Sequence, residues 1–520
     1  MQTLGDLIRR AGIIHGPRPA LVYGRRSYTY AEHTVRIYRL ANALSDKGLR
    51  QQDRVAVLAR NCAEYMEAFG AAEVVGFILV NLNVRLSEPE LVRICLDCQP
   101  SCLIFAEEFA GIAKAVQAAV SDLRVLVRID EAQSGEDSYE ALVQAASPES
   151  PTLYSKPHHI AHLMYTSGTT GGPKGVMLTH RAFVEAVRIS SHEGGVQPTE
   201  RALIVMPFFH LGGKLEQMGF SFLGGAIILR STFDPIEILE TIERERISAA
   251  HFAPIMIQRL LDALETSRRS YDLSSLRLVH YASAPMPAPV LRRALDRFGP
   301  IFVQVYGMTE CIMGSTLKAH QHRPDGSESD QRRLSSAGQP CFGNEVRIVR
   351  EDGTSCGRDE VGEILIRSPT LMLGYWNKTS ATVDALQDGW YATQDLGKLD
   401  DEGYLYVVDR KKDMIISGGE NIHSWEVEEV LRAHPSIAEA AVIAVPDAEW
   451  GEAVKACVVL RHGRSLEGDA VIEYCRANLA SYKKPRSVDF FSELPRLFNG
   501  KIDKKTLRAP YWSGRDHQVS

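Results

Sequence analysis

The segment 165–176, YTSGTTGGPKGV, combines the residue types that hold a polyphosphate. Its glycines leave backbone N–H groups free to surround an anion, its hydroxyls add donors, and Lys174 adds a positive charge. Pro173 precedes that lysine and no G-x-x-x-x-G-K-[ST] can be drawn, so this is not a Walker A loop. The plain alternative is a flexible linker, but linkers seldom carry Pro-Lys-Gly before an apolar run. We predict phosphate contacts from Thr166, Ser167, Gly168, Thr169, Thr170, Gly171 and Lys174.

An alternation of strand-like and helix-like stretches must position this segment. A buried strand is expected at 54–59 and a helix at 63–75, and further strands at 102–105, 202–206, 226–229 and 276–281. Strands separated by helices predict an α/β layer architecture. Short strands with glycine turns from 346 to 408 predict a β-rich subdomain, and the polar stretch 320–336 predicts a surface loop. The order helix, strand, strand, helix is expected at 425–433, 437–445, 455–460 and 468–479, the size of a small α+β domain.

Composition excludes several classes of protein. The 520 residues carry 59 Lys+Arg and 65 Asp+Glu, a net charge of −6, so no basic excess suggests nucleic acid as a partner. Nine cysteines at irregular spacing argue against a disulfide scaffold. Cys95, Cys98 and Cys102 have only a superficial metal spacing, because a helix is expected to end at Cys98 and a strand to begin at Cys102. No run of about 18 apolar residues predicts a membrane helix, and the cytoplasm is the expected compartment.

The phosphate segment and the motifs after it resemble the adenylate-forming enzymes. That family includes acyl-CoA synthetases, aryl-CoA ligases, nonribosomal-peptide adenylation domains and firefly luciferase. The motifs follow in the family's order and cover nearly the whole chain: QVYGMTE at 304–310, GYW at 374–376, WYATQD at 390–395, DRKKDMIISGGEN at 409–421 and NGK at 499–501. The resemblance implies a large N-terminal domain, residues 1–409, and a small mobile C-terminal α+β domain, residues 410–520.

The reaction that the resemblance implies makes chemical sense. A carboxylate is a poor acyl donor, but transfer to the α-phosphate of ATP gives an acyl adenylate that a thiol can attack. Bringing a carboxylate to a polyanion requires cations and oriented donors. By resemblance Lys501 performs adenylation, since a charge on a flexible stem reaches both a carboxylate oxygen and the α-phosphate. Glu310 anchors Mg²⁺, which prefers oxygen ligands, and Thr309 lies near the α-phosphate.

The nucleotide site follows from the same resemblance. Tyr306 stacks on adenine opposite a wall formed by 283–285, and Asp395 accepts from the ribose with Arg410 beside it. The family's usual Thr-Gly-Asp reads Thr-Gln-Asp here, so Gln394 brings a Cβ to a position where relatives have glycine. The set implied for adenine and ribose is Ser283, Ala284, Pro285, Tyr306, Gly307, Asp395 and Arg410.

CoA and the acid have their own implied residues. Gly418 and Gly419 line the pantetheine tunnel and Trp450 contacts CoA, with a hairpin turn and a structural tryptophan as the plain alternatives. Lys412 is the hinge on which the small domain turns. His210 is the gate between ATP and the acid, and the acyl pocket is assigned to His210, Gly213, Met308 and Met313.

These inferences predict an ATP-dependent acid–CoA ligase that uses ATP, Mg²⁺ and CoA. The apolar candidates for the pocket favour a medium- to long-chain fatty acid, with an aryl or short branched acid as the alternative. Adenylation followed by loading of a carrier protein, and a silent nucleotide-binding protein, are the rival functions. Acetylation of Lys501 by a lysine acetyltransferase is a hypothesis, and the identity of the acid and a homodimer are left open.

Overall fold

The structure is a computed structural model. It describes residues 1–130, 132–133, 135–166, 173–410, 413–417, 420–447, 450–497 and 501–512. The chain forms two compact units. The first comprises Met1–Val346 and Ile366–Tyr391, and the second comprises Arg347–Leu365 and Ala392–Ser520.

A nine-stranded sheet carries most of the motif residues of the first unit. Six of its strands, from β14 through β13, β12, β10 and β11 to β1, run parallel, so their carboxyl ends share one edge. In sheet order the strands are β16 (Gln339–Pro340), β15 (Ser315–Leu317), β14 (Phe302–Tyr306), β13 (Leu278–Tyr281), β12 (Ala249–Phe252), β10 (Arg201–Ile204), β11 (Ala226–Leu229), β1 (Pro19–Tyr23) and β2 (Arg26–Thr29).

A second sheet of eight strands holds both ends of the phosphate segment. Two neighbouring strands, β8 and β9, pair antiparallel, with Thr166 opposite Lys174. In sheet order the strands are β19 (Gly374–Tyr375), β9 (Lys174–Thr179), β8 (Ile160–Thr166), β4 (Ile78–Asn81), β3 (Arg54–Leu58), β5 (Cys102–Phe105), β6 (Val125–Arg128) and β7 (Asp137–Ser138).

Helices cover both sheets and separate them. They are α1 (Leu4–Ile14), α2 (Tyr30–Asp46), α3 (Ala63–Val75), α4 (Glu88–Cys98), η1 (Glu107–Phe109), α5 (Ala110–Ala119), α6 (Tyr139–Ala145), α7 (His180–Glu193), α8 (Leu211–Ser221), α9 (Pro235–Glu245), α10 (Pro254–Thr266), α11 (Ala288–Phe298), η2 (Ala319–Gln321), α12 (Glu328–Arg333) and α13 (Thr379–Ala385).

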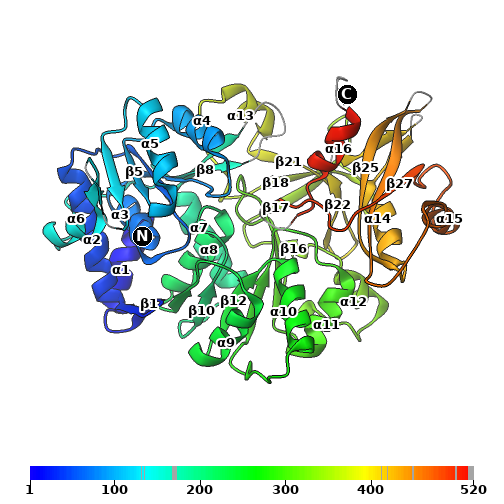
Figure 1. Cartoon of the computed structure of the whole chain (residues 1–520), viewed down its shortest axis with the longest axis horizontal. Coiled ribbons are helices and arrows are strands. Elements are labelled where there is room, and N and C mark those ends of the chain that lie inside the picture. Colours follow the sequence, from blue (N-terminus) through cyan, green and yellow to red (C-terminus); the bar gives the residue numbers. More distant parts are fainter. Residues whose placement is uncertain are drawn as a thin grey trace. The chain divides into compact units, whose positions relative to one another are not determined.

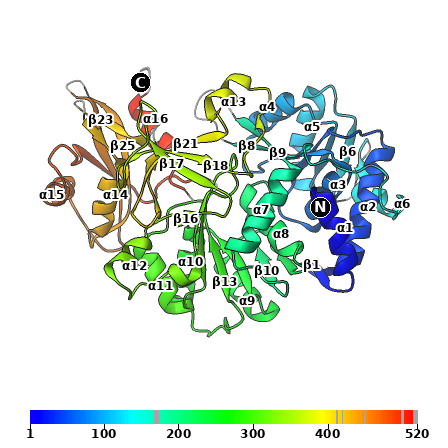
Figure 2. The same cartoon turned by 180° about the vertical axis from the view of Figure 1, so that it is seen from behind.

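The helices and sheets of this unit lie in layers (Figures 1 and 2), and three hydrophobic cores pack between them. One lies between the two sheets and includes α3, which is buried along all 13 of its residues. Another packs α9, α10 and α11 on the outer face of the nine-stranded sheet, and the third packs α4 and α5 on the eight-stranded sheet. The layers therefore alternate helix, sheet, helix, sheet, helix, which confirms the predicted α/β class.

The expectation of a loop throughout 320–336 is wrong in part. Residues Glu328–Arg333 form α12. Ser327 caps this helix by accepting from the Asp330 N–H, while the Asp330 carboxylate accepts from the Ser327 N–H at 3.0 Å. Such a reciprocal box satisfies otherwise unpaired donors at a helix start. These bonds stabilise a short polar helix that lacks the apolar stripe by which a helix is predicted from sequence.

The second unit is β-rich and then α+β; both stretches have the predicted type, although the β-rich one was expected as a subdomain of the N-terminal domain. The chain enters and leaves it along β17 (Glu345–Val349), β18 (Gly362–Arg367) and β21 (Trp390–Leu399), which share a sheet with β20 (Leu386–Gln387) and β22 (Leu405–Arg410). A separate sheet follows in the order β24 (Glu420–Ile422), β23 (Ile415–Ser417), β26 (Gly451–Leu460) and β25 (Ile437–Asp447), with β27 (Ser487–Phe490) beside β26. Its helices are α14 (Ser424–Ala433), α15 (Gly468–Asn478) and α16 (Lys504–Trp512). The boundary at 409/410 stays a prediction.

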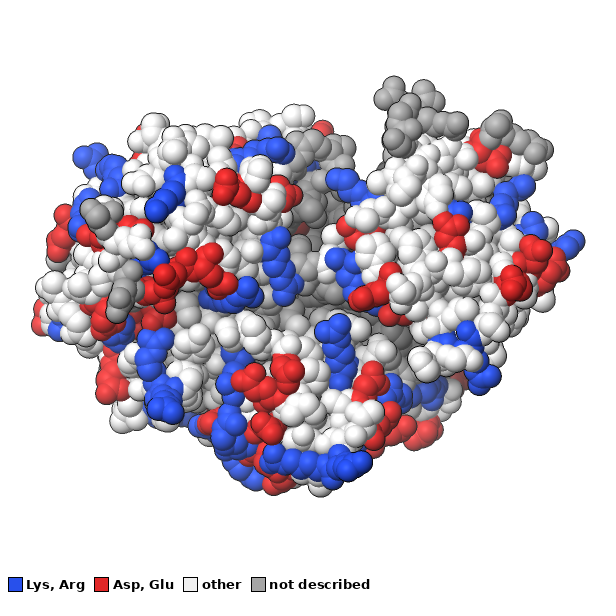
Figure 3. All heavy atoms as spheres, viewed as in Figure 1, with Lys and Arg blue, Asp and Glu red and all other residues white. Residues whose placement is uncertain are grey.

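Two properties of the molecule bear on its partners. On the face seen in Figure 3, positive and negative side chains are interspersed, in keeping with a net charge of −6. None of the helices in the described ranges combines the length and the apolar character that a bilayer crossing needs.

Candidate active site

The carboxyl edge of the nine-stranded sheet gathers the motif residues of the first unit. Residues 206–210 follow β10, Ser283 follows β13, and Tyr306 is the last residue of β14. Ligands of open α/β sheets bind at this edge, because loops there can converge without interrupting the strands. The fold thus brings together segments that are a hundred residues apart in the sequence.

The turn after β14 has a tightly constrained backbone. A Cβ on Gly307 would lie 2.2 Å from the Ile312 carbonyl oxygen, so only glycine fits. The Gly314 N–H donates to the Tyr306 carbonyl at 2.8 Å, and the Ile312 N–H donates to the Met308 carbonyl at 2.8 Å. These bonds close a compact loop that contains Thr309 and Glu310. On the neighbouring strand end, Ser283 has a left-handed backbone, with φ of 74°.

Glu310 and Lys174 meet at one side chain, Tyr375. The Tyr375 hydroxyl donates to Glu310 Oε1 at 3.0 Å, and the Lys174 ammonium lies 4.9 Å from the centre of the Tyr375 ring. Burial and the Glu310 carboxylate raise the pKa of Tyr375, so its hydroxyl keeps its proton and acts as a donor. The end of the predicted phosphate segment and the predicted metal anchor therefore lie against the same tyrosine.

Tyr375 is a site residue that sequence reasoning did not single out. It lies in β19, which pairs with β9 so that Tyr375 stands opposite Val176. The Trp376 N–H donates to the Gly175 carbonyl at 2.7 Å and holds the two strands together. The signal was present in the motif at 374–376, but only the strand pairing gives the tyrosine a partner.

Two buried asparagines hold the segment 206–210. Asn61 accepts from the Phe208 N–H at 2.8 Å and donates to the Met206 carbonyl at 3.0 Å. Asn81 donates to the Phe208 carbonyl at 3.0 Å. Asn61 follows β3 and Asn81 ends β4, and both strands belong to the eight-stranded sheet. Hydrogen bonds from that sheet therefore hold the backbone of the segment in place. Neither asparagine was predicted, because nothing in the sequence places it near 208.

His210 lies at the start of α8, in the N-cap position. Its ring is 4.5 Å from the Phe209 ring in an edge-on arrangement. Burial lowers the pKa of His210 to about 3, with a further contribution from the Arg85 charge, so the imidazole is neutral at physiological pH. A neutral ring suits the predicted gate, since it adds no fixed charge between the two substrates.

The predicted walls of the acyl pocket are largely buried. A Cβ on Gly213 would lie 2.6 Å from the Met206 and Pro207 carbonyl oxygens, so the first turn of α8 approaches that backbone closely. Met313 and Cys311 are buried, and burial raises the pKa of the Cys311 thiol, with the neighbouring Cys341 and Glu310 adding to the shift. Cys311 is therefore a neutral thiol immediately after Glu310.

In the second unit, Asp395 is buried in β21 and stands opposite Arg410 of β22. Its N–H donates to the Thr393 hydroxyl at 3.0 Å, and that hydroxyl donates to the Ile364 carbonyl at 2.8 Å. Gln394, between them, has φ of 59°, and its side chain is exposed. The backbone thus adopts here the left-handed conformation that glycine takes most easily.

We predict that Gln394→Gly stabilises this unit by about 1 kcal/mol, because a Cβ in the left-handed region costs energy that glycine avoids. The expected result is a higher midpoint of thermal unfolding. Gln394→Ala is the matched control, since it keeps the Cβ and should bring no gain. A midpoint lowered by the glycine would show that the positive φ is not strained.

The segment before α16 presents Lys501. The Leu497 N–H donates to the Lys501 carbonyl at 2.7 Å, and the Asp503 N–H donates to the Pro495 carbonyl at 2.8 Å. These bonds join the two chain segments on either side of residues 498–500, which lie outside the described ranges. The neighbouring Lys504 ammonium pairs with Glu428 at 2.7 Å and is largely buried.

Trp450 is partly exposed, and the Arg486 guanidinium lies 4.5 Å from the centre of its ring. An indole ring with a cation beside it suits a ligand that carries a nucleotide. The contact of Trp450 with CoA stays a prediction. The remaining predicted residues lie outside the described ranges: Ser167, Gly168, Thr169, Thr170, Gly171, Lys412, Gly418 and Gly419. The side chain of Arg410 is likewise not described.

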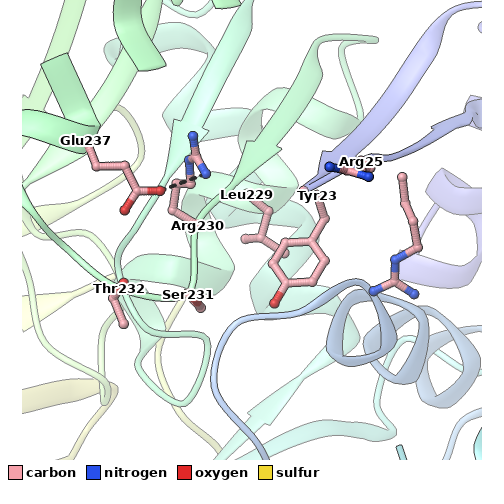
Figure 4. Close-up of a pocket in the computed structure, with 9 residues that line it drawn as sticks. Tyr23, Arg25, Leu229, Arg230, Ser231, Thr232 and Glu237 are labelled. Carbon is pink, nitrogen blue, oxygen red and sulfur yellow. Dashed lines mark ion pairs between the residues drawn. The ribbon is translucent and has the colours of Figure 1, made fainter. Parts of the chain in front are cut away.

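A pocket of about 360 Å³ lies elsewhere on the first unit, between the β1–β2 turn and the end of β11 (Figure 4). Arg230, on its wall, pairs with Glu237 at 2.9 Å, and Arg26 pairs with Glu64 at 2.5 Å. These acids offset much of the positive charge. None of the predicted site residues lines this pocket.

Two family models match the chain. Residues 10–376 match the model of the AMP-binding enzyme family, and residues 426–501 match that of the AMP-binding enzyme C-terminal domain. The solved structure of the amide bond synthetase McbA from Marinactinospora thermotolerans superposes with a TM-score of 0.87 at 31% identity. The match covers 98% of this chain and 99% of that one.

Curated relatives align over almost the full length. Feruloyl-CoA synthase from a Streptomyces species is 40% identical, covering 98% of this chain and 99% of that protein. Indoleacetate–CoA ligase from Aromatoleum aromaticum is 37% identical, covering 96% of each. The long-chain-fatty-acid–CoA ligase FadD13 from Mycobacterium tuberculosis is 33% identical, covering 98% and 99%. The chain therefore belongs to the AMP-binding enzyme family.

Proposed function

We propose that this protein is an AMP-forming acid–CoA ligase that activates an aromatic carboxylic acid. The observation that carries the proposal is the cluster in which Tyr375 joins Lys174 to Glu310 at the edge of the nine-stranded sheet. A cation and a carboxylate held by one donor at a strand-end edge suit a metal-bound polyphosphate.

In the first half-reaction the acid's carboxylate oxygen attacks the α-phosphate of ATP, and pyrophosphate leaves. The segment that ends at Lys174 holds the β- and γ-phosphates, and Lys501 bridges the attacking oxygen and the α-phosphate. Mg²⁺, when bound, neutralises charge on the phosphates, and a single carboxylate such as Glu310 fits an ion that keeps several of its waters. Thr309 donates to the α-phosphate.

We assign the contacts to the nucleoside residue by residue from the family resemblance. Tyr306 stacks on the adenine, opposite the wall of Ser283, Ala284 and Pro285. Asp395 accepts from the ribose hydroxyls, a role that suits a carboxylate with a fixed backbone. Gln394 adopts a left-handed backbone, the conformation that glycine takes most easily, and the Asp395 N–H next to it keeps its hydrogen bond to the Thr393 hydroxyl.

In the second half-reaction the CoA sulfur attacks the adenylate carbonyl, and AMP leaves. We assign the approach of pantetheine to Gly418 and Gly419, with Trp450 against the nucleotide end. Rotation at Lys412 exchanges the surface bearing Lys501 for the one bearing the glycine pair. His210, half-buried and neutral, separates the acid from the nucleotide.

The choice of an aromatic acid reverses the order of preference that the sequence alone favoured. Apolar pocket residues such as Met308 and Met313 accept an alkyl chain or a ring equally well, so they do not distinguish a fatty acid from an aromatic acid. The feruloyl and indoleacetate enzymes, at 40% and 37% identity, are both named for acids that carry an aromatic ring. The fatty-acid ligase is less similar, at 33%.

The test is a panel of acids incubated with ATP, Mg²⁺ and CoA, in which pyrophosphate, AMP and thioester are measured together. We expect cinnamic and indoleacetic acids to give thioester with kcat/KM values at least about tenfold above those for fatty acids of 8 to 16 carbons, given the discrimination that pocket shape supplies. A preference for fatty acids would overturn the aromatic assignment. Pyrophosphate without thioester would indicate a different acceptor, an amine or a carrier-protein thiol.

A further inference from the structure

A cluster of charged and hydroxyl side chains surrounds the start of α14 in the second unit. The Ser424 N–H and the Ser424 hydroxyl both donate to Asp409 Oδ2, at 2.7 and 2.9 Å. The Lys504 ammonium donates to the same hydroxyl at 2.7 Å and pairs with Glu428 Oε1 at 2.7 Å. One buried serine therefore joins three elements, β22, α14 and α16.

Asp409 supplies a cap that α14 does not find in its own segment. The first N–H groups of a helix have no partner within the helix, and His423, in the N-cap position, makes no side-chain hydrogen bond to them. The Asp409 carboxylate accepts from the N–H of Ser424, the first residue of α14. A negative charge at this end is also favoured by the helix dipole. The start of α14 thus depends on a residue of the preceding strand, β22.

The Lys504 ammonium stays charged although it is largely buried. Burial alone would lower the pKa of Lys504, but the carboxylates of Glu428, Asp409 and Asp413 raise it above its usual value. Asp409 comes before residues 411–412, which lie outside the described ranges, and the other two acids come after them. One cation is therefore shared by acids from both sides of that short stretch.

These contacts span the residue at which the small domain is predicted to turn. With the hinge at Lys412, Asp409 remains on one side of it, while Ser424 and Lys504 move with the other. Hydrogen bonds of 2.7 and 2.9 Å do not survive a rotation that carries their donors away. The cluster is therefore complete in one orientation of the small domain, and a contact made in only one of two states stabilises that state.

The strand that neighbours Asp409 indicates which half-reaction this orientation serves. Asp409 lies in β22, which pairs with β21, the strand that carries the predicted ribose contact Asp395. Lys504 is the first residue of α16 and follows Lys501 by three positions. The cluster thus ties the segment of Lys501 to the strand next to the ribose contact, as adenylation requires.

We propose that Asp409 is a positioning residue, which through Ser424 holds Lys501 in the orientation for adenylation and releases it before CoA reacts. The inference rests on the proposed function, because it uses the roles assigned there to Lys501 and Lys412. The cluster transfers no group and sets only the balance between two orientations of the small domain. Weakening it slows the first half-reaction relative to the second.

The experiment measures the two half-reactions separately in Asp409→Ala. With cinnamic acid, adenylation is followed as acid-dependent exchange of pyrophosphate into ATP. Thioester formation is followed from supplied cinnamoyl adenylate and CoA. We expect the ratio of the first rate to the second to fall at least about fivefold, because a hydrogen bond to a charged group shifts an equilibrium by roughly ten- to a hundredfold. Asp409→Asn keeps an acceptor oxygen for Ser424 and should recover part of the ratio.

Asp489→Ala is the matched control. Asp489 pairs with the largely buried ammonium of Lys455 at 2.7 Å, so this variant also takes a carboxylate away from a lysine of the small domain. Both residues follow the hinge, so their pair does not span it. A loss of stability here acts on both half-reactions alike, and the ratio should stay within about twofold of the wild-type value.

The outcomes separate the two proposals. Absence of exchange in the wild-type protein with both cinnamic and indoleacetic acids would contradict the proposed function itself. An unchanged or increased ratio in Asp409→Ala, while the wild-type protein exchanges normally, would overturn the role of Asp409. An equal fall in Asp489→Ala would assign the effect to general destabilisation of the small domain and would overturn that role as well.

Discussion

Replacing Lys501 with alanine should lower acid-dependent exchange of pyrophosphate into ATP by at least about a hundredfold, the usual loss when a charge that stabilises the transition state is removed. The half-reaction that follows should survive, because thioester formation from a supplied acyl adenylate does not need the lysine. Measuring both half-reactions on one variant therefore distinguishes loss of the adenylation charge from loss of the fold.

The chain offers a control for this variant four residues away. Lys505 is exposed and belongs to the same lysine-rich tail, so Lys505→Ala removes a charge without touching the segment that presents Lys501. It should retain full exchange. If Lys501→Ala kept more than a tenth of the wild-type exchange, the assignment of the adenylation charge to this residue would be wrong.

The largest effect on stability is expected from Lys214→Met. The Lys214 ammonium lies 2.6 Å from Glu73 Oε1 with both side chains essentially unexposed, and it also donates to Gln217 at 2.8 Å. His162 Nε2 is 2.9 Å from the same carboxylate oxygen. Removing the lysine leaves a buried carboxylate without its main cation, which costs about 3–5 kcal/mol. Urea unfolding followed by tryptophan fluorescence should show a lower midpoint.

A double variant tests whether the cost comes from the unpaired charge. Lys214→Met with Glu73→Leu removes both ions, and apolar replacement of a whole buried pair is often close to neutral. We expect the double variant to recover most of the lost midpoint. Equal destabilisation of the single and double variants would place the cost in packing around Phe69, whose ring lies 4.3 Å from the ammonium.

The core elements were predictable because their patterns are local. The helix expected at 63–75 has these bounds in the structure, and the strand expected at 226–229 is β11. A continuous apolar run indicates where a buried helix or strand begins and ends. The helix at 328–333 was missed because its stability comes from the reciprocal bonds of Ser327 and Asp330 rather than from an apolar stripe.

The site was predictable only where its residues occur in contiguous motifs. Lys174, Glu310 and Lys501 were all singled out in this way. Tyr375 was not, because its role arises when β19 pairs with β9 and brings it to Glu310.

The neutral thiol of Cys311 has a consequence for an enzyme that makes a reactive acylating agent. An acyl adenylate modifies any thiolate within reach, and self-acylation next to Glu310 would inactivate the site with its own intermediate. Cys311 is buried and burial raises its pKa, so it offers the mixed anhydride no nucleophile at physiological pH. The acyl group is thereby reserved for a thiol that arrives from solution, and a cysteine can lie beside the predicted chemistry without competing for its product.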